Sequence, residues 1–183
     1  QSNRKRNWFN LDWFLYNFKL ESELNEMTSL SLNFFGLNAK RKSLGFRSNR
    51  VDQIDPFEER DLIFGDFNNY GLESKLLNKY KVLNKKSIFL LGFKYYNSNN
   101  TGEQGPGINN SDPNFNFQYD LFPNYRYQSL FTYPNLNFSF FGENIFYLSN
   151  KFSITPGFRF ENIKTQSDGF YKNINLDAAD NVI

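Results

Sequence analysis

Long stretches of this chain alternate between apolar and polar side chains, and this period of two constrains the fold more than any other feature. In the first stretch Phe14, Tyr16 and Phe18 fall on one side, and Asn17 and Lys19 fall on the other. Successive side chains of an extended chain point to opposite faces of a sheet. The pattern therefore predicts β-strands with one apolar face and one polar face.

Six stretches carry this pattern, and each is bounded by turn-forming residues such as Asn, Gly and Ser. The predicted strands span about 7–24, 28–44, 69–82, 87–98, 136–148 and 152–163. Pro156 lies within the last stretch and has no N–H to donate to a neighbouring strand. We therefore expect a local irregularity there.

The connections between these strands alternate between short and long. Tight turns are expected near 25–27, 83–86 and 149–151. Long loops are expected at about 45–68, 99–135 and 164–183. Short turns at one edge and long loops at the other are typical of bacterial outer-membrane barrels. The fold class predicted is all-β, an antiparallel transmembrane β-barrel segment of about six strands.

The composition agrees with a sheet that meets lipid on one side and water on the other. Of the 183 residues 20% are aromatic, with 23 Phe and 11 Tyr, yet the mean hydropathy is −0.64. A soluble core draws more on Val, Ile, Leu and Ala. A strand of 18 residues spans roughly 60 Å at about 3.3 Å per residue. Even when tilted, such strands extend beyond an apolar band of about 25 Å.

Several classes of function are disfavoured by what the sequence contains. The net charge of +2, from 21 basic and 19 acidic residues, is too balanced to indicate a nucleic-acid partner. The chain has no histidine and no cysteine, which removes the commonest general base and the thiolate metal ligands. We expect no enzyme activity, no catalytic residues, no metal site and no resident cofactor. The basic residues 4–6 are expected to form a solvated loop.

The sequence is expected to be an internal fragment of a longer polypeptide. It begins with Gln, has no signal peptide, and contains no apolar run long enough for a transmembrane helix. Membrane sheets must close to satisfy their backbone groups, and the smallest closed barrels have eight strands. Six strands leave two open edges, so further strands must come from elsewhere.

Two motifs give the chain a family resemblance. Residues 153–163, SITPGFRFENI, follow FGEN at 141–144, and together they resemble the "FAEN … ITPGxRxExI" hairpin of TonB-dependent receptors. Residues 92–96, GFKYY, followed by NTGEQG at 100–105, resemble the "GxRYxxxxTxxxQG" pattern of the ferric-citrate subfamily. RDLI at 60–63 with NYGLE at 69–73 is similar to Bacteroidetes-like members of that subfamily.

The resemblance implies a fold and a set of partners. The fold is a barrel of 22 strands filled by a plug domain, of which this chain carries no part. The receptor lies in the outer membrane of a Gram-negative cell, in contact with membrane lipid and lipopolysaccharide. It takes up a small-molecule Fe(III) chelate, here ferric citrate, with energy from TonB through the plug. This chain is then part of the barrel wall.

Candidate ligand-binding residues are Lys94 and Gln104. Lys94 is predicted to point inward near the top of its strand, and Gln104 is predicted to lie in the loop just beyond. The family pattern has Arg at the position of Lys94, and Lys offers a point charge in place of a planar fork. For both residues the ordinary alternatives, a solvated lumen lysine and a loop amide, remain open.

A second group of charged residues is predicted to be structural. Glu143, Arg159 and Glu161 share one face across a hairpin, which indicates an ionic cluster on the lumen wall. Such a cluster would hold the strands in register or contact a plug, and it is not expected to bind the ligand.

Three alternative functions remain open at this point. The chain could belong to a receptor for another siderophore or an oligosaccharide. It could belong to a passive porin. It could also be a soluble β-rich adhesion domain, in which case the aromatic residues would form a closed hydrophobic core.

Overall fold

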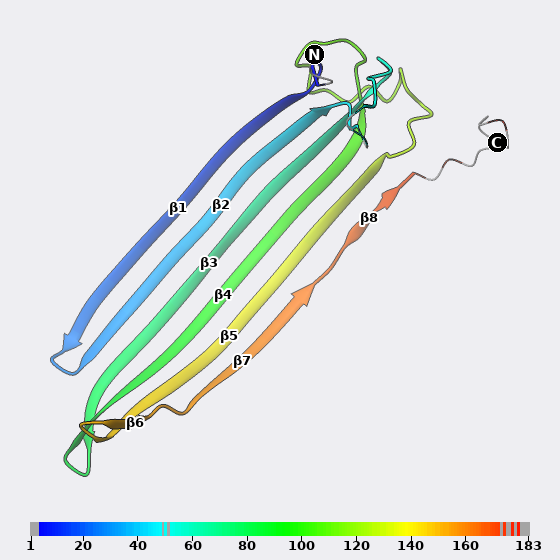
Figure 1. Cartoon of the computed structure of the whole chain (residues 1–183). Coiled ribbons are helices and arrows are strands. Elements are labelled where there is room, and N and C mark those ends of the chain that lie inside the picture. Colours follow the sequence, from blue (N-terminus) through cyan, green and yellow to red (C-terminus); the bar gives the residue numbers. More distant parts are fainter. Residues whose placement is uncertain are drawn as a thin grey trace.

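The computed structural model describes residues 4–48, 50, 52–172, 174, 177 and 179, and all regular structure in this part of the chain is β-strand. The strands are β1 (Trp8–Asn25), β2 (Thr28–Gly45), β3 (Arg60–Val82), β4 (Lys85–Gly107), β5 (Ser129–Ser149), β6 (Phe152–Ile154), β7 (Gly157–Thr165) and β8 (Asp168–Tyr171). They form a single layer of long strands lying side by side (Figure 1).

The sheet is antiparallel throughout, and β1 to β5 are neighbours in chain order. β6, β7 and β8 pair with successive parts of β5, so they form a sixth strand interrupted twice. The expected irregularity at Pro156 is confirmed, because β6 ends at Ile154 and β7 begins at Gly157. The carbonyl of Pro156 still accepts a hydrogen bond of 2.9 Å from the Asn144 N–H.

The connections are sorted between the two ends of the sheet. β1 joins β2 through a turn in which the Asn25 side chain accepts a hydrogen bond of 2.9 Å from the Met27 N–H. β3 joins β4 through Leu83 and Asn84, whose φ values of 48° and 62° are those of a type I′ hairpin turn. The long loops 46–59 and 108–128 lie at the opposite end with the N-terminus (Figure 1). The predicted all-β antiparallel architecture is confirmed.

The loop boundaries predicted from the sequence were wrong at the loop end of the sheet. β3 begins at Arg60, inside the loop predicted for 45–68, and β4 continues to Gly107, inside the loop predicted for 99–135. β8 lies within the loop predicted for 164–183. The added part of β4, NNTGEQGPG at 99–107, is rich in Asn and Gly, which have low strand propensity. Pairing with neighbouring strands overrides that propensity.

One face of the sheet carries a continuous apolar band. The register of the paired strands places all of its members on the same face of the sheet. They are Phe14, Tyr16, Phe18, Leu20, Leu30, Leu32, Phe34, Tyr70, Leu72, Leu76, Phe89, Leu91, Phe93, Tyr95, Leu136, Phe138, Phe140, Phe158 and Phe160. Through the register Phe14 lies level with Asn99 of β4. From that level down to Phe89 the strand runs about 33 Å, or about 23 Å of height at a tilt of 45°. This matches the apolar band of outer-membrane barrels.

The polarity of the two faces exchanges above the apolar band, toward the long loops. There the band's own face carries Asp12, Lys40 and Asp66, which are paired across β1, β2 and β3. The opposite face carries the apolar residues of β1 at alternate positions from Phe9 to Leu15. The β1–β2 register is unbroken through this exchange. The exchange is therefore a change in which face carries the apolar residues, and not a shift of the strand register. It explains why the upper part of β2 does not follow the alternation of its lower part.

Side chains are fully buried mainly at the loop end. Leu44, Leu62 and Tyr125 are at most 4% exposed there, as are the guanidinium-bearing side chains of Arg6 and Arg60. Most large apolar side chains of the band remain exposed; Phe18, for example, is 67% exposed. No closed hydrophobic interior forms in the described part of the chain. Nor does that part contain a helix that is long and apolar enough to cross a membrane.

Candidate functional site

The face opposite the apolar band carries a line of polar side chains at one height, which we call the ionic row. Each member is the pair partner of the next, from β1 to β7. Its members are Lys19, Asn33, Glu73, Lys94, Ser139 and Glu161. Glu21, Lys75 and Arg159 lie one row below. Positive and negative charges alternate along the row.

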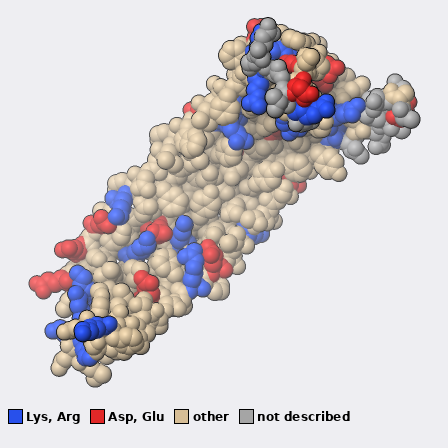
Figure 2. All heavy atoms as spheres, viewed as in Figure 1, with Lys and Arg blue, Asp and Glu red and all other residues tan. Residues whose placement is uncertain are grey.

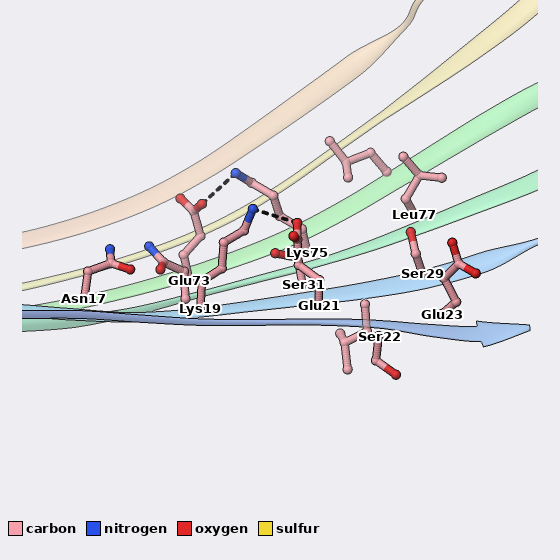
Figure 3. Close-up of a pocket in the computed structure, with 13 residues that line it drawn as sticks. Asn17, Lys19, Glu21, Ser22, Glu23, Ser29, Ser31, Glu73, Lys75 and Leu77 are labelled. Carbon is pink, nitrogen blue, oxygen red and sulfur yellow. Dashed lines mark ion pairs between the residues drawn. The ribbon is translucent and has the colours of Figure 1, made fainter.

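The ionic row borders a hollow of about 800 Å³ at the β1–β3 end of the sheet. Figure 3 shows two ion pairs there, Lys19 with Glu21 and Lys75 with Glu73, both at 2.6 Å. These side chains are between 25% and 66% exposed. Exposed pairs of this kind contribute about 0–1 kcal/mol each. The ion pairs therefore add little to the stability of the sheet. Their main effect is to make this face polar and nearly neutral in net charge.

Lys94 lies in the ionic row, in the lower half of β4, so its predicted position near the top of the strand was wrong. Glu73 of β3 lies directly beside it in the pair register. Its ammonium also lies over the Phe35 ring, 5.8 Å from the ring centroid. Lys94 thus has a carboxylate on the neighbouring strand, although Glu73 itself forms its ion pair with Lys75.

Gln104 lies within β4 and not in the loop beyond it, which corrects the second position predicted from the sequence. Its amide donates a hydrogen bond of 3.1 Å to the Tyr125 hydroxyl, which in turn donates one of 2.6 Å to Asp61. Ten residues of strand separate Gln104 from Lys94, or about 33 Å. The structure therefore does not bring these two candidates into one site.

Two members of the predicted lumen-wall cluster lie together, and the third lies apart. Arg159 donates a hydrogen bond of 3.0 Å to Glu161, and the Asn137 amide donates another of 3.2 Å to the same carboxylate. Glu143 is paired in register with Leu90 and Gly157. It forms no ion pair with any residue that the structure describes.

The loop end contains a buried network that the sequence reading missed, which we call the arginine cap. Arg6 binds the Asp55 carboxylate with two nitrogens and donates to the carbonyls of Glu58 and Asn109. It is 1% exposed, so the prediction of a solvated loop for residues 4–6 was wrong for Arg6. Its partners lie 49 and 103 positions away, and no local pattern marks such contacts.

Arg60 completes the arginine cap. Its guanidinium donates to the carbonyls of Arg6, Ile108 and Asp112, at 2.9, 2.7 and 2.8 Å. These bonds tie the start of the chain to loop 108–128, while Arg6 ties it to loop 46–59. Both long loops are therefore held on the sheet by buried, charge-assisted hydrogen bonds.

The electrostatics of the cap follow from this geometry. The hydrogen bond from Arg6 lowers the pKa of the Asp55 carboxyl below its ordinary value. Burial lowers the pKa of the Arg60 guanidinium, and the nearby Arg6 cation lowers it further. An arginine begins so far above neutrality that it stays charged.

Within the described residues no group of three or more Asp or Glu side chains lies close enough to hold a metal ion. The oxygens of Asn109, Asn110 and Asp112 instead accept hydrogen bonds from Arg6 and Arg60.

Comparison with known proteins bears on the fold. No protein-family model and no curated protein matches the chain. Among solved structures it is similar to the ferric citrate transporter FecA in its unliganded form, with a TM-score of 0.67 and 14% sequence identity. The match covers 92% of this chain and 23% of the FecA chain. The described sheet thus has the fold of one section of a FecA-like barrel wall.

Proposed function

We propose that this chain is part of the barrel wall of a TonB-dependent outer-membrane transporter that takes up an anionic iron chelate. Ferric citrate is the first substrate to test. The observation that carries the proposal is the two-faced sheet, in which an apolar band lies opposite an ionic row. A wall with lipid on one side and an aqueous lumen on the other requires this distribution.

Two further observations support the proposal. The residues at 141–144 and 153–163 resemble a hairpin of TonB-dependent receptors. The sheet also shares its fold with a section of the ferric citrate transporter FecA. Its partners would be membrane lipid and lipopolysaccharide outside, the remaining barrel and a plug domain inside, and TonB through that plug. We propose no catalytic role.

The proposal is tested by measuring the uptake of radioactive iron supplied as citrate, in cells with and without the parent gene. The expected result is saturable uptake that is lost when TonB is absent. Growth on ferric citrate that is unaffected by deletion of the parent gene would remove the citrate assignment. Uptake that continues without TonB would favour the passive porin.

The remaining alternatives separate in the same assay. The cells could take up another iron chelate or an oligosaccharide in a TonB-dependent manner, and take up no ferric citrate. That result would support a TonB-dependent transporter with a different substrate. A soluble adhesion domain predicts that the parent protein is recovered from the aqueous fraction without detergent.

Lys94 remains a candidate ligand contact within this proposal. Lys94→Ala is expected to weaken chelate binding while the barrel still assembles. Because Glu73 lies beside Lys94 in the register, unchanged affinity would assign Lys94 to the ionic row alone. Gln104 is tested in the same way with Gln104→Leu, which also removes its hydrogen bond to Tyr125.

A further inference from the structure

Above the ionic row, the same face changes from charged to aromatic, and we call this region the aromatic wall. Its residues lie at alternate positions of β1, β2, β3 and β5. They are Phe9, Leu11, Trp13, Leu15, Leu37, Phe67, Phe131 and Tyr133. Figure 2 shows a face with charges at its two ends and an uncharged expanse between them.

A furrow crosses the aromatic wall where two glycines are paired. Gly65 of β3 lies opposite Gly102 of β4, so two neighbouring strands lack side chains at the same height. The Phe67 ring lies 2.9 Å from where a Cβ of Gly65 would be, and the Tyr133 ring lies 3.6 Å from that of Gly102. A hollow of about 290 Å³ adjoins them. The Phe67 ring thus covers Gly65, and the shallow groove is open at Gly102 beside the Tyr133 ring.

Arg41 lies at the edge of this furrow, paired in register with Gly65. Its guanidinium lies 5.7 Å from the centroid of the Phe67 ring, a cation–π contact. Between the ionic row and Gln104, it is the only charged residue that β1–β5 place on this face. Among the described residues it has no carboxylate partner. Lys94 below it, in contrast, has Glu73 beside it.

An uncompensated cation on a neutral aromatic wall is complementary to an anion that also has a flat apolar surface. We propose that Arg41, Phe67, Tyr133 and the Gly65–Gly102 furrow form a subsite for an anionic iron chelate whose organic ligand carries an aromatic ring. This inference rests on the proposed uptake of an iron chelate and narrows its chemical class. Citrate supplies the negative charge but no ring, so it would use only Arg41.

The test uses the full-length parent protein in detergent and two probes, the Fe(III) complexes of dihydroxybenzoate and of citrate. Both complexes are anionic, and only the first has rings. We expect the dihydroxybenzoate complex to bind the wild type about tenfold or more tightly than the citrate complex. Arg41→Gln should weaken both by about 10-fold to 100-fold, the range for a lost charge-assisted hydrogen bond. Tyr133→Leu should weaken only the dihydroxybenzoate complex.

Lys42→Gln is the matched control. Lys42 is the next residue on β2, points to the other face, and lies over the Phe64 ring at the same 5.7 Å. It should leave both affinities unchanged. Heat-modifiable migration of each variant on gels checks that the barrel has assembled.

Three outcomes would overturn the inference. One is unchanged affinity for both probes in Arg41→Gln. Another is equal binding of the two complexes by the wild type, with no effect of Tyr133→Leu. In both cases the proposed transport still stands if uptake depends on TonB. If instead cells take up no iron chelate in a TonB-dependent manner, the proposed function fails and the inference fails with it.

Discussion

Arg6 and Arg60 are 1% and 0% exposed, although arginine is among the residues least often buried. A buried guanidinium without partners would be strongly destabilising. Here each guanidinium donates hydrogen bonds to carbonyl or carboxylate oxygens of loops that are distant in the sequence. The positive φ of 60° at Phe57 places its ring against Arg6, at 5.0 Å from the guanidinium carbon. These two residues thereby determine how both loops lie.

Substitution of Arg60 is expected to release loop 108–128. Arg60→Ala leaves the carbonyls of Arg6, Ile108 and Asp112 without their donor, and we expect a local cost of about 3 kcal/mol. Hydrogen exchange of the loop amides in the detergent-solubilised parent protein measures this. The control is Arg50→Ala, because Arg50 and its partner Asp52 are 78% and 82% exposed. Equal exchange in the two variants would contradict the role given to Arg60.

Tyr125 is expected to make the same loop sensitive to alkali. Burial, reinforced by its hydrogen bond to Asp61, raises the pKa of the Tyr125 hydroxyl well above its ordinary value. Its contribution to stability is therefore fully present below pH of about 10, the ordinary tyrosine pKa, and declines as the pH rises further. Protease cleavage of loop 108–128 should accelerate above that pH in the wild type. Tyr125→Phe should cleave faster at neutral pH and lack this additional rise.

At the scale of the strands, glycines recur where an aromatic ring from a neighbouring strand covers the backbone. Tyr16 covers Gly36, Phe35 covers Gly71, Phe141 covers Gly92 and Phe158 covers Gly142. A ring laid across a glycine fills the space that a side chain would occupy and shields the strand backbone. Because each pair joins specific positions, these contacts favour a single register of the strands.

Gly92 and Gly102 provide a direct comparison on one strand. A Cβ at Gly92 would lie 2.2 Å from the Phe141 ring, whereas at Gly102 the nearest atom is 3.6 Å away. Gly92→Ala should therefore destabilise the sheet by about 1–3 kcal/mol, the range for overpacking, and Gly102→Ala should be tolerated. Urea unfolding of the parent protein in lipid vesicles measures both. A smaller effect at Gly92 than at Gly102 would show that the ring moves aside freely.

For the whole molecule, the exchange of polarity along the strands would mark the depth of the sheet in the membrane of the proposed transporter. The apolar band ends where Asp12, Lys40 and Asp66 begin on the same face. Strands of 23 residues span roughly 75 Å, far more than the band requires. The upper half of the sheet would then stand above the membrane, with its outer face in water.

A charge introduced at two heights on the same face tests this placement. Phe93→Arg places a charge within the apolar band and should destabilise the folded protein in vesicles by about 2–4 kcal/mol. Thr101→Arg lies on the same face of β4, level with Asp66, and should cost about 0–1 kcal/mol. Urea unfolding in vesicles distinguishes the two. Equal costs would place Thr101 at the same depth as Phe93 and contradict the boundary.

The candidate site was predicted less completely than the fold. Alternation located Lys94 and Arg159 on the correct face, because the face depends only on parity along a strand. Their positions along the strands and some of their contact partners were predicted incorrectly, because these depend on how far the strands extend. Arg41 was overlooked for the same reason, since its charge is distinctive only beside the neutral residues that β3, β4 and β5 place around it.

Local pattern alone determined which stretches form the six long strands, where the tight turns lie, and the two-faced character of the sheet. Each of these features depends on residues that are close together in the sequence, so the alternation of side chains and the turn residues predict it directly. The tertiary structure alone decided how far β3 and β4 extend, how the long loops lie, and which charges remain uncompensated. Those features depend on contacts between residues such as Arg6 and Asn109, 103 positions apart. Such contacts form, and stabilise the structure, only after the strands have paired.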